Sequence, residues 1–260
     1  MELNTIYNED LFDTMKRMEE NNIKVDVILT SPPYNTGRNI INSKNRDKHM
    51  KLHEIRYDVY LENRDNEEYC KWTVDIFNSY DKILCENGCI LYNMSYGSEN
   101  PTQLWLVLTE VLKNTNFTIA DTIVWKKKCA IPNNVSPNKL TRLCEFVFVI
   151  CRKSEYKTFS ANKKVVSISR TGQKIYENIV NFIEAKNNDG SCNLNKATYS
   201  SELCEKLLDI YAHPNSIVYD SFMGTGTTAV ACKKLGHSYI GSEISTKQCE
   251  FANNRLNLIN

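Results

Sequence analysis

The sequence predicts an α/β fold in which a mostly parallel sheet carries helices on both faces. Short apolar runs alternate with amphipathic segments along both halves of the chain, which is the pattern of consecutive βα units. In addition, the glycine-containing turn 222–226 joins an apolar run to a helical segment, as at the nucleotide-binding edge of such sheets. The chain has 260 residues, 42% of them hydrophobic and 24% charged, which suits one large domain with inserted loops.

The N-terminal half supplies most of the predicted strands. The apolar run Val25–Thr30 has the length and composition of a strand. Asn66 and the two acids after it are typical of a helix start, and apolar residues then recur at helical spacing until Gly88 stops the helix. The other predicted elements are a strand before Asp10, a helix over 11–18, a strand over 89–96, a helix over 102–113, and an antiparallel pair of strands over 117–125 and 146–151.

The last third of the chain is a second series of βα units. Its predicted elements are a helix over 199–212, a strand over 216–219, a helix over 229–235 that Gly236 ends, a strand over 237–241 and a helix over 247–259. Residues 154–191 mix basic and aromatic side chains and suit a small inserted module, and residues 35–65 suit a long mobile loop. We therefore divide one domain into the halves 1–153 and 192–260, with the insert 154–191 between them.

The composition indicates where in the cell the protein is expected and whether it is expected to bind a metal ion. No apolar stretch approaches the roughly 20 residues of a membrane span, and the first residues lack the pattern of a signal peptide, so we expect a cytoplasmic protein with no membrane partner. The ten cysteines are scattered and none forms a Cys-x-x-Cys pair. They are therefore interpreted as reduced, buried apolar residues, with no metal site and no disulfide framework.

Positive charge is concentrated in one stretch of a nearly neutral chain. From Lys126 to Lys174 there are twelve basic residues against two acidic ones, so this stretch carries a charge of +10 and the rest of the chain −9, for a total of +1. Such a stretch is typical of a surface that binds a polyanion. A solvated surface without a ligand is the structural alternative.

Ser31–Tyr34 closes the predicted strand Val25–Thr30 with two consecutive prolines. Neither proline has an N–H group, so the chain must leave the sheet there. It then presents a hydroxyl, carbonyls free of local partners and an aromatic face, which together can hold a flat ring and accept hydrogen bonds from its amino group. An ordinary turn is the alternative interpretation.

The turn 222–226 and Glu243 predict a pocket for an adenosine-containing cofactor. The glycines allow a ligand to approach the backbone at the start of a helix, and Glu243, at the end of the next strand, can accept both hydroxyls of a ribose. A dinucleotide fingerprint requires glycine where Ala229 stands, and the turn lacks the lysine of a phosphate-binding loop. A cofactor without phosphate therefore fits better. Glu243 as a cap of the final helix is the alternative.

The two motifs 30–35 and 220–228 together resemble the β group of the DNA amino-methyltransferases, which place the catalytic motif before the cofactor motif. The resemblance implies a Rossmann-like methyltransferase fold with a seven-stranded sheet, and S-adenosylmethionine (SAM) as cofactor. Residues 8–10 resemble the contact of the family to the cofactor adenine, and residues 195–200 resemble its segment over the methionine end. Ser221 stands where the family usually has proline, and we expect this to change the rigidity of the turn.

The resemblance also assigns roles to individual residues. The implied catalytic residues are Ser31, Pro32, Pro33 and Tyr34. The implied cofactor-binding residues are Asp10, Thr198, Ser200, Asp220, Phe222, Gly224, Gly226, Thr227 and Glu243. Residue type and charge suggest as DNA-binding residues Arg38, Lys126, Lys128, Arg142, Lys163, Lys164, Arg170, Gln173 and Lys174. The half 1–153 then carries catalysis, the insert 154–191 target recognition, and the half 192–260 the cofactor.

Several of these residues have structural alternatives. Asp10 is equally suited to cap the helix over 11–18. Tyr176 and Phe182 in the insert suit a small core better than a platform on which bases stack.

The expected activity is methyl transfer to the exocyclic amine of a base flipped out of double-stranded DNA. Ser31 Oγ and the Pro32 carbonyl would accept hydrogen bonds from the amine, and Tyr34 would stack on the base. Ser31 in place of an aspartate, and the form of segment 197–200, resemble the cytosine-N4 branch more than the adenine-N6 branch.

Three alternatives stay open beside that expectation. The chain can act on adenine N6 by the same mechanism, it can methylate RNA or a protein amide, or it can be a non-catalytic DNA-binding relative. Further partners suggested by the family are a second copy of the chain and the cognate endonuclease of a restriction–modification system.

Overall fold

The computed structural model describes residues 1–35, 64–95, 100–129, 132, 137–190 and 198–259. Along these residues the secondary structure follows the order β1 (Thr5–Tyr7), α1 (Leu11–Glu20), β2 (Val25–Thr30), α2 (Asn66–Ile83), β3 (Leu84–Met94), α3 (Gln103–Asn114), β4 (Phe117–Lys127), β5 (Cys144–Arg152), the 3-10 helix η3 (Lys153–Glu155), β6 (Val165–Ile168), β7 (Lys174–Tyr176), β8 (Phe182–Ala185), α4 (Ser201–Tyr211), β9 (Ile217–Asp220), α5 (Thr227–Leu235), β10 (Ser238–Ser242) and α6 (Thr246–Asn257).

The central sheet contains eight of the described strands in the order β1-β10-β9-β2-β3-β5-β4-β8. All neighbouring pairs are parallel except β3 with β5 and β4 with β5. The expected α/β class with a mostly parallel sheet is therefore confirmed, including the antiparallel pair formed by β4 and β5. The sheet has one strand more than the seven expected, because β8 adds to its edge.

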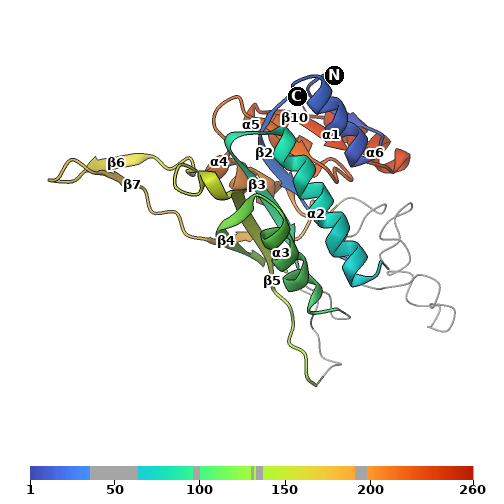
Figure 1. Ribbon diagram of the computed structural model, residues 1–260, viewed down its shortest axis with the longest axis horizontal. Coiled ribbons are helices and arrows are strands. Elements are labelled where there is room, and N and C mark those ends of the chain that lie inside the picture. The colour runs from blue at the N-terminus through green and yellow to red at the C-terminus, as the bar shows by residue number, and fades with distance from the viewer. Residues whose placement is uncertain (36–63, 96–99, 130–131, 133–136, 191–197, 260) are drawn as a thin grey trace.

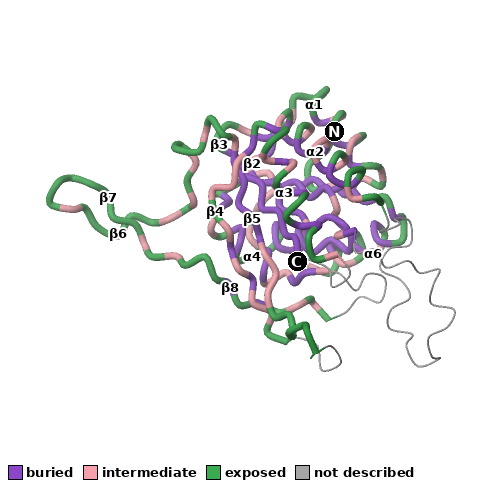
Figure 2. The backbone as a smooth tube through the Cα atoms, turned by 60° about the horizontal axis from the view of Figure 1, so that its bottom comes forward, coloured by how far each residue is buried: buried purple, intermediate pink, exposed green. Residues whose placement is uncertain are grey.

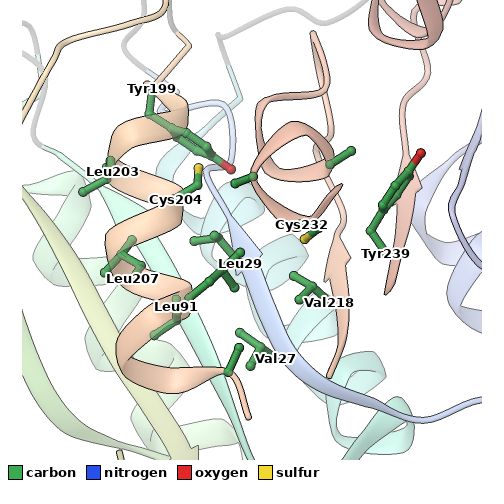
Figure 3. Packing of buried hydrophobic residues seen from close by; sticks show 14 of the residues in the cluster. Val27, Leu29, Leu91, Tyr199, Leu203, Cys204, Leu207, Val218, Cys232 and Tyr239 are labelled. Carbon is green, nitrogen blue, oxygen red and sulfur yellow. The ribbon is translucent and has the colours of Figure 1, made fainter. Parts of the chain in front are cut away.

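Helices cover both faces of the sheet. Successive residues of a strand point to opposite faces, so β2 contributes side chains to the cores on both sides. Val27 and Leu29 of β2 belong to a core that includes α4, α5 and α6, and Figure 3 draws them in one cluster with Cys204 and Leu207 of α4. Ile28, between them, belongs to the second core, which includes α1, α2 and α3. The two faces that the pattern predicts are therefore both buried.

The ends of α2 differ from the sequence-based expectation. Its N-cap is Asp65, whose side chain accepts a hydrogen bond from Glu67 N, and not Asn66. The helix ends at Ile83, and Gly88 lies inside β3. Strand β3 begins early because Leu84 pairs with Val25 of the neighbouring parallel strand, so sheet pairing decides this boundary before a glycine is reached.

The segment 154–191 divides into two parts. Strands β6 and β7 form an antiparallel hairpin that projects from the body, and every residue of both strands is exposed (Figures 1 and 2). Strand β8 instead pairs with β4 in the central sheet. Tyr176 and Phe182 are each 49% exposed, so their interpretation as core is wrong.

The described residues were expected to contain no membrane-spanning helix and no metal site. None of the helices they form is long and apolar enough to cross a membrane. The same residues contain no cluster of three side chains able to bind a metal ion, and their cysteines form no disulfide.

Candidate active site

A pocket of about 200 Å³ opens at the edge of the sheet where the parallel strands end. Strands β2, β9 and β10 run parallel, so their carboxyl ends meet at this edge, which is where α/β sheets bind ligands. The pocket includes residues from both motifs, Ser31 and Pro33 from the first and residues 221–225 from the second. The sheet thus brings together two segments that lie almost 200 positions apart in the sequence.

The glycine-containing turn has the close backbone packing that its sequence suggests. Gly226 is the N-cap of α5 with φ of 80°, in the left-handed region. A Cβ atom there would lie 2.8 Å from the Cβ of Ala252 in α6. Met223 N donates to the Ser242 carbonyl and fixes the turn against the end of β10. Only glycine fits the Gly226 position without displacing α6.

Glu243 lies at the base of the pocket and is 9% exposed. Its Oε2 accepts from Gly224 N at 2.7 Å, and its Oε1 accepts from Ser245 N at 2.8 Å. These two hydrogen bonds orient the carboxylate within the pocket. The N-cap of α6 is Ser245, so the alternative interpretation of Glu243 as the cap of this helix is wrong.

Asp220 supports the pocket from behind and does not line it. It is 1% exposed and accepts hydrogen bonds from Thr30 Oγ1, Phe222 N, Tyr199 OH and Thr228 Oγ1 at 2.6–3.0 Å. Burial raises the pKa of this carboxyl above its ordinary value, against the effect of the donors. Asp220 therefore joins β2, the turn 222–226, the first turn of α5 and the segment before α4 around one buried acid.

Some of the other expected cofactor residues line the pocket and others lie behind its lining. Phe222, Gly224, Thr227 and Thr198 line the pocket, whereas Gly226 does not. Ser200 also lies outside the lining and caps α4 by accepting from Leu203 N. Asp10 lines the pocket and is also the N-cap of α1, where its side chain accepts from Phe12 N. It therefore lies where both the cofactor-binding and the capping interpretations expect it.

Ser31–Tyr34 leaves the sheet as its prolines require. Ser31 lines the pocket, and Pro32 and Pro33 are buried. The Pro33 carbonyl has no local partner, as expected, but its oxygen accepts from the distant Tyr69 OH of α2. Among the described residues none donates to the Pro32 carbonyl. The half-buried Tyr34 lies beside Ser31, whose Oγ donates to its hydroxyl at 3.2 Å.

Trp72 and Arg64 are pocket residues that the sequence pattern did not single out. The Trp72 ring lies 5.7 Å from that of Phe222 in an edge-on arrangement, and the Arg64 guanidinium lies 4.6 Å from the centre of the Trp72 ring. Trp72 satisfies the apolar spacing of α2, so nothing in the sequence separates it from a core residue. Only the packing of α2 beside the turn 222–226 reveals its position.

The expected DNA-binding residues fall into two groups. Lys126, Lys128 and Arg142 lie where β4 ends and β5 begins, at the same edge as the pocket, and the two lysines form ion pairs with Glu184 and Glu202. The second group, which belongs to the hairpin and its base, consists of Lys163, Lys164, Arg170, Gln173 and Lys174. The hairpin follows the end of β5, at the opposite edge, so the structure does not bring this group to the pocket. Arg38 and most of the predicted loop 35–65 lie outside the described residues.

Comparison with known proteins gives consistent matches. A model of the DNA methylase family matches residues 25–254. The type II methyltransferase M.BglII of Bacillus subtilis is 25% identical over 270 residues, which cover 96% of this chain and 68% of M.BglII. The crystal structure of M1.HpyAVI has a TM-score of 0.62 at 25% identity and covers 98% of this chain and 99% of its own. M1.HpyAVI has also been solved as a SAM complex.

A further structural match supports the fold alone. The PvuII DNA methyltransferase, described as cytosine-N4-specific, has a TM-score of 0.68 and covers 98% of this chain and 87% of its own. Its sequence identity is 14%.

Proposed function

The chain belongs to the DNA methylase family, and from this premise we propose that it transfers a methyl group from SAM to the exocyclic amine of a base in double-stranded DNA, with N4 of cytosine as the target. The observation that carries the proposal is the single pocket shared by Ser31 and the turn 222–226. A reactive methyl group and its acceptor must meet in one place, and this pocket is lined by both motifs.

The described pocket residues fit SAM by their charge and shape. Three of them, Glu9, Asp10 and Glu243, carry carboxyl groups, which suits a cationic ligand without phosphate. Glu243 lines the pocket with a carboxylate, the kind of group that accepts from ribose hydroxyls, and Phe222 and Trp72 offer aromatic surface for an adenine ring. When bound, SAM supplies an electrophilic methyl group on a sulfonium sulfur.

The residues of this chain would activate and hold the base. The lone pair of an arylamine is delocalised into its ring and is a poor nucleophile. Hydrogen bonds from the amine to Ser31 Oγ and the Pro32 carbonyl shift electron density to the nitrogen as the transition state forms. Tyr34 would stack on the base, a contact worth about 1–3 kcal/mol in other complexes. Since a hydroxyl is a weak base, the proton of the product leaves to solvent.

The target base must leave the duplex to reach such a pocket, at a cost of a few kcal/mol. We assign backbone contacts to Lys126, Lys128 and Arg142, which lie at the edge of the pocket. Arg170, Gln173 and Lys174 were expected to read base edges, but their hairpin lies at the opposite edge of the sheet, so we assign them no contact with the bases beside the target. A second copy of the chain and a cognate endonuclease remain proposed partners. Light scattering of the purified chain measures the first, and co-purification measures the second.

Ser31→Ala tests the catalytic assignment. Methyl transfer from labelled SAM to duplex DNA should be abolished, while calorimetry shows unchanged SAM binding. Mass spectrometry of nucleosides from the methylated DNA identifies the base. N6-methyladenine without N4-methylcytosine would contradict the choice of cytosine. Transfer to RNA or protein but not to DNA would contradict the assignment of DNA as the substrate. A wild-type chain that fails to bind SAM would support a non-catalytic DNA-binding role.

A further inference from the structure

Glu145 lies beside the catalytic motif although it is distant in the sequence. It is the second residue of β5, an antiparallel strand that starts at the sheet edge where β2 and β3 end. Its side chain is 14% exposed, and its Oε1 accepts from Lys127 Nζ at 2.5 Å. Its other oxygen, Oε2, lies 3.0 Å from Tyr34 OH. A half-buried, oriented carboxylate therefore contacts the residue expected to stack on the target base.

The hydrogen bonds around Tyr34 OH have a defined direction. Asn93 Nδ2 donates to the Phe146 carbonyl at 3.0 Å, which leaves Asn93 Oδ1 to accept from Tyr34 OH at 3.1 Å. Glu145 Oε2 is also an acceptor, since an ionised carboxylate has no proton to donate. The hydroxyl proton of Tyr34 therefore points toward Asn93 or Glu145. Its oxygen is left to accept, and Ser31 Oγ donates to it.

This direction decides which way Ser31 presents its hydroxyl. A serine hydroxyl is one donor and two acceptor sites, and only the acceptor sites suit the hydrogens of an amine. With its proton on Tyr34, Ser31 Oγ keeps both lone pairs for another partner. We propose that Glu145 is a positioning residue that acts through Tyr34 to hold Ser31 as the hydrogen-bond acceptor of the target amine. The proposal rests on the proposed function, in which Ser31 contacts that amine.

Glu145→Gln tests this role with little change in shape. Lys127 Nζ can only donate, so it should hold the amide oxygen of the glutamine and turn the amide NH₂ toward Tyr34. That NH₂ would compete with Ser31 for the Tyr34 oxygen, and Ser31 would lose its fixed direction. We expect kcat to fall about tenfold or more, as when an outer partner of a catalytic group is lost. The KM values for SAM and DNA should stay unchanged.

Tyr34→Phe supplies the second variant, because it keeps the aromatic ring and removes the hydroxyl. Its loss in kcat should equal that of Glu145→Gln, and the double variant should be no slower than Tyr34→Phe alone. The matched control is Glu184→Gln, which removes a carboxylate from the ion pair with Lys126, the neighbour of Lys127. This control should leave kcat unchanged. Thermal unfolding of each variant shows whether the fold is retained.

Two results would overturn the inference. One is a folded Glu145→Gln variant with the kcat of the wild type, and the other is a double variant in which the two losses multiply, since Glu145 would then act independently of Tyr34. Both leave the proposed function standing as long as the wild type methylates DNA and Ser31→Ala does not. A wild type without DNA methylation would instead contradict the proposed function itself.

Discussion

Two side chains at the pocket show how closely its geometry depends on single residues. Gly226 permits the turn to approach α6, and the buried Asp220 joins four segments through four hydrogen bonds. Gly226 is required by the space available to the backbone, and Asp220 is required by the hydrogen bonds that a buried carboxyl accepts. Substitution of each should therefore have a different signature.

Gly226→Ala should lower the free energy of unfolding by about 2–5 kcal/mol. The left-handed conformation of a non-glycine residue costs about 1–2 kcal/mol, and the contact with Ala252 adds about 1–3 kcal/mol of overpacking. Gly172→Ala is the matched control, because Gly172 has nearly the same φ of +82° and nothing within 4 Å of its added Cβ. Urea unfolding measures both variants, and equal losses would contradict the packing argument.

Asp220→Asn should change how stability depends on pH. Burial raises the pKa of the Asp220 carboxyl above its ordinary value of 3.8, so between the two values the folded chain holds a proton that the unfolded chain has released. Stability contributed by this group is therefore greatest at low pH and falls as pH rises through that interval. The stability of the wild type minus that of Asp220→Asn should decrease from about pH 4 upward. Denaturant unfolding over a pH series measures this difference, and an increase would contradict the assigned direction.

At the scale of elements, the segment 154–191 combines one part that supports the fold with one that does not. Strand β8 is part of the central sheet and buries Ile183 and Ala185 in the core that includes α4, whereas β6 and β7 bury no residue. Glu177 N donates to the Lys164 carbonyl at 2.9 Å, so the chain enters and leaves the hairpin at adjacent positions. The hairpin can therefore be removed without stretching the remainder.

Replacement of residues 165–176 by two glycines should leave the thermal midpoint and SAM affinity unchanged, because no buried contact is lost. DNA methylation should also be retained, because the hairpin lies at the edge of the sheet opposite the pocket. The control Ile183→Ala should lower the free energy of unfolding by about 2–5 kcal/mol. A loss of methylation or of site preference in the shortened chain would contradict this separation of the hairpin from the bound DNA.

At the scale of the whole molecule, the separation of charge predicts binding that depends on salt. Neutralised phosphates release counterions, so the logarithm of the DNA association constant should fall linearly with the logarithm of salt concentration. Arg142→Gln, at the pocket edge, should reduce this slope by about 1. Lys234→Gln is the control, because Lys234 belongs to α5 and pairs with Glu205. Fluorescence anisotropy over a salt series measures both slopes, and equal effects would contradict the assigned binding edge.

The sequence by itself determined the fold class, most elements and the family, because these depend on local patterns. Apolar periodicity located the strands and helices, and two motifs with restrictive backbone chemistry identified the pocket. The ends of α2 were misplaced because pairing between β2 and β3 overrides a local stop signal.

Only the tertiary structure decided which side chains share the pocket. Trp72 lines the pocket and Glu145 contacts Tyr34, although both have ordinary positions in a helix and a strand. They reach the site because the sheet brings their elements to one edge. The same packing placed Asp220 behind the pocket and the hairpin away from it. Contacts between distant segments have no local signal, since they depend on strand order and direction, which no single segment encodes.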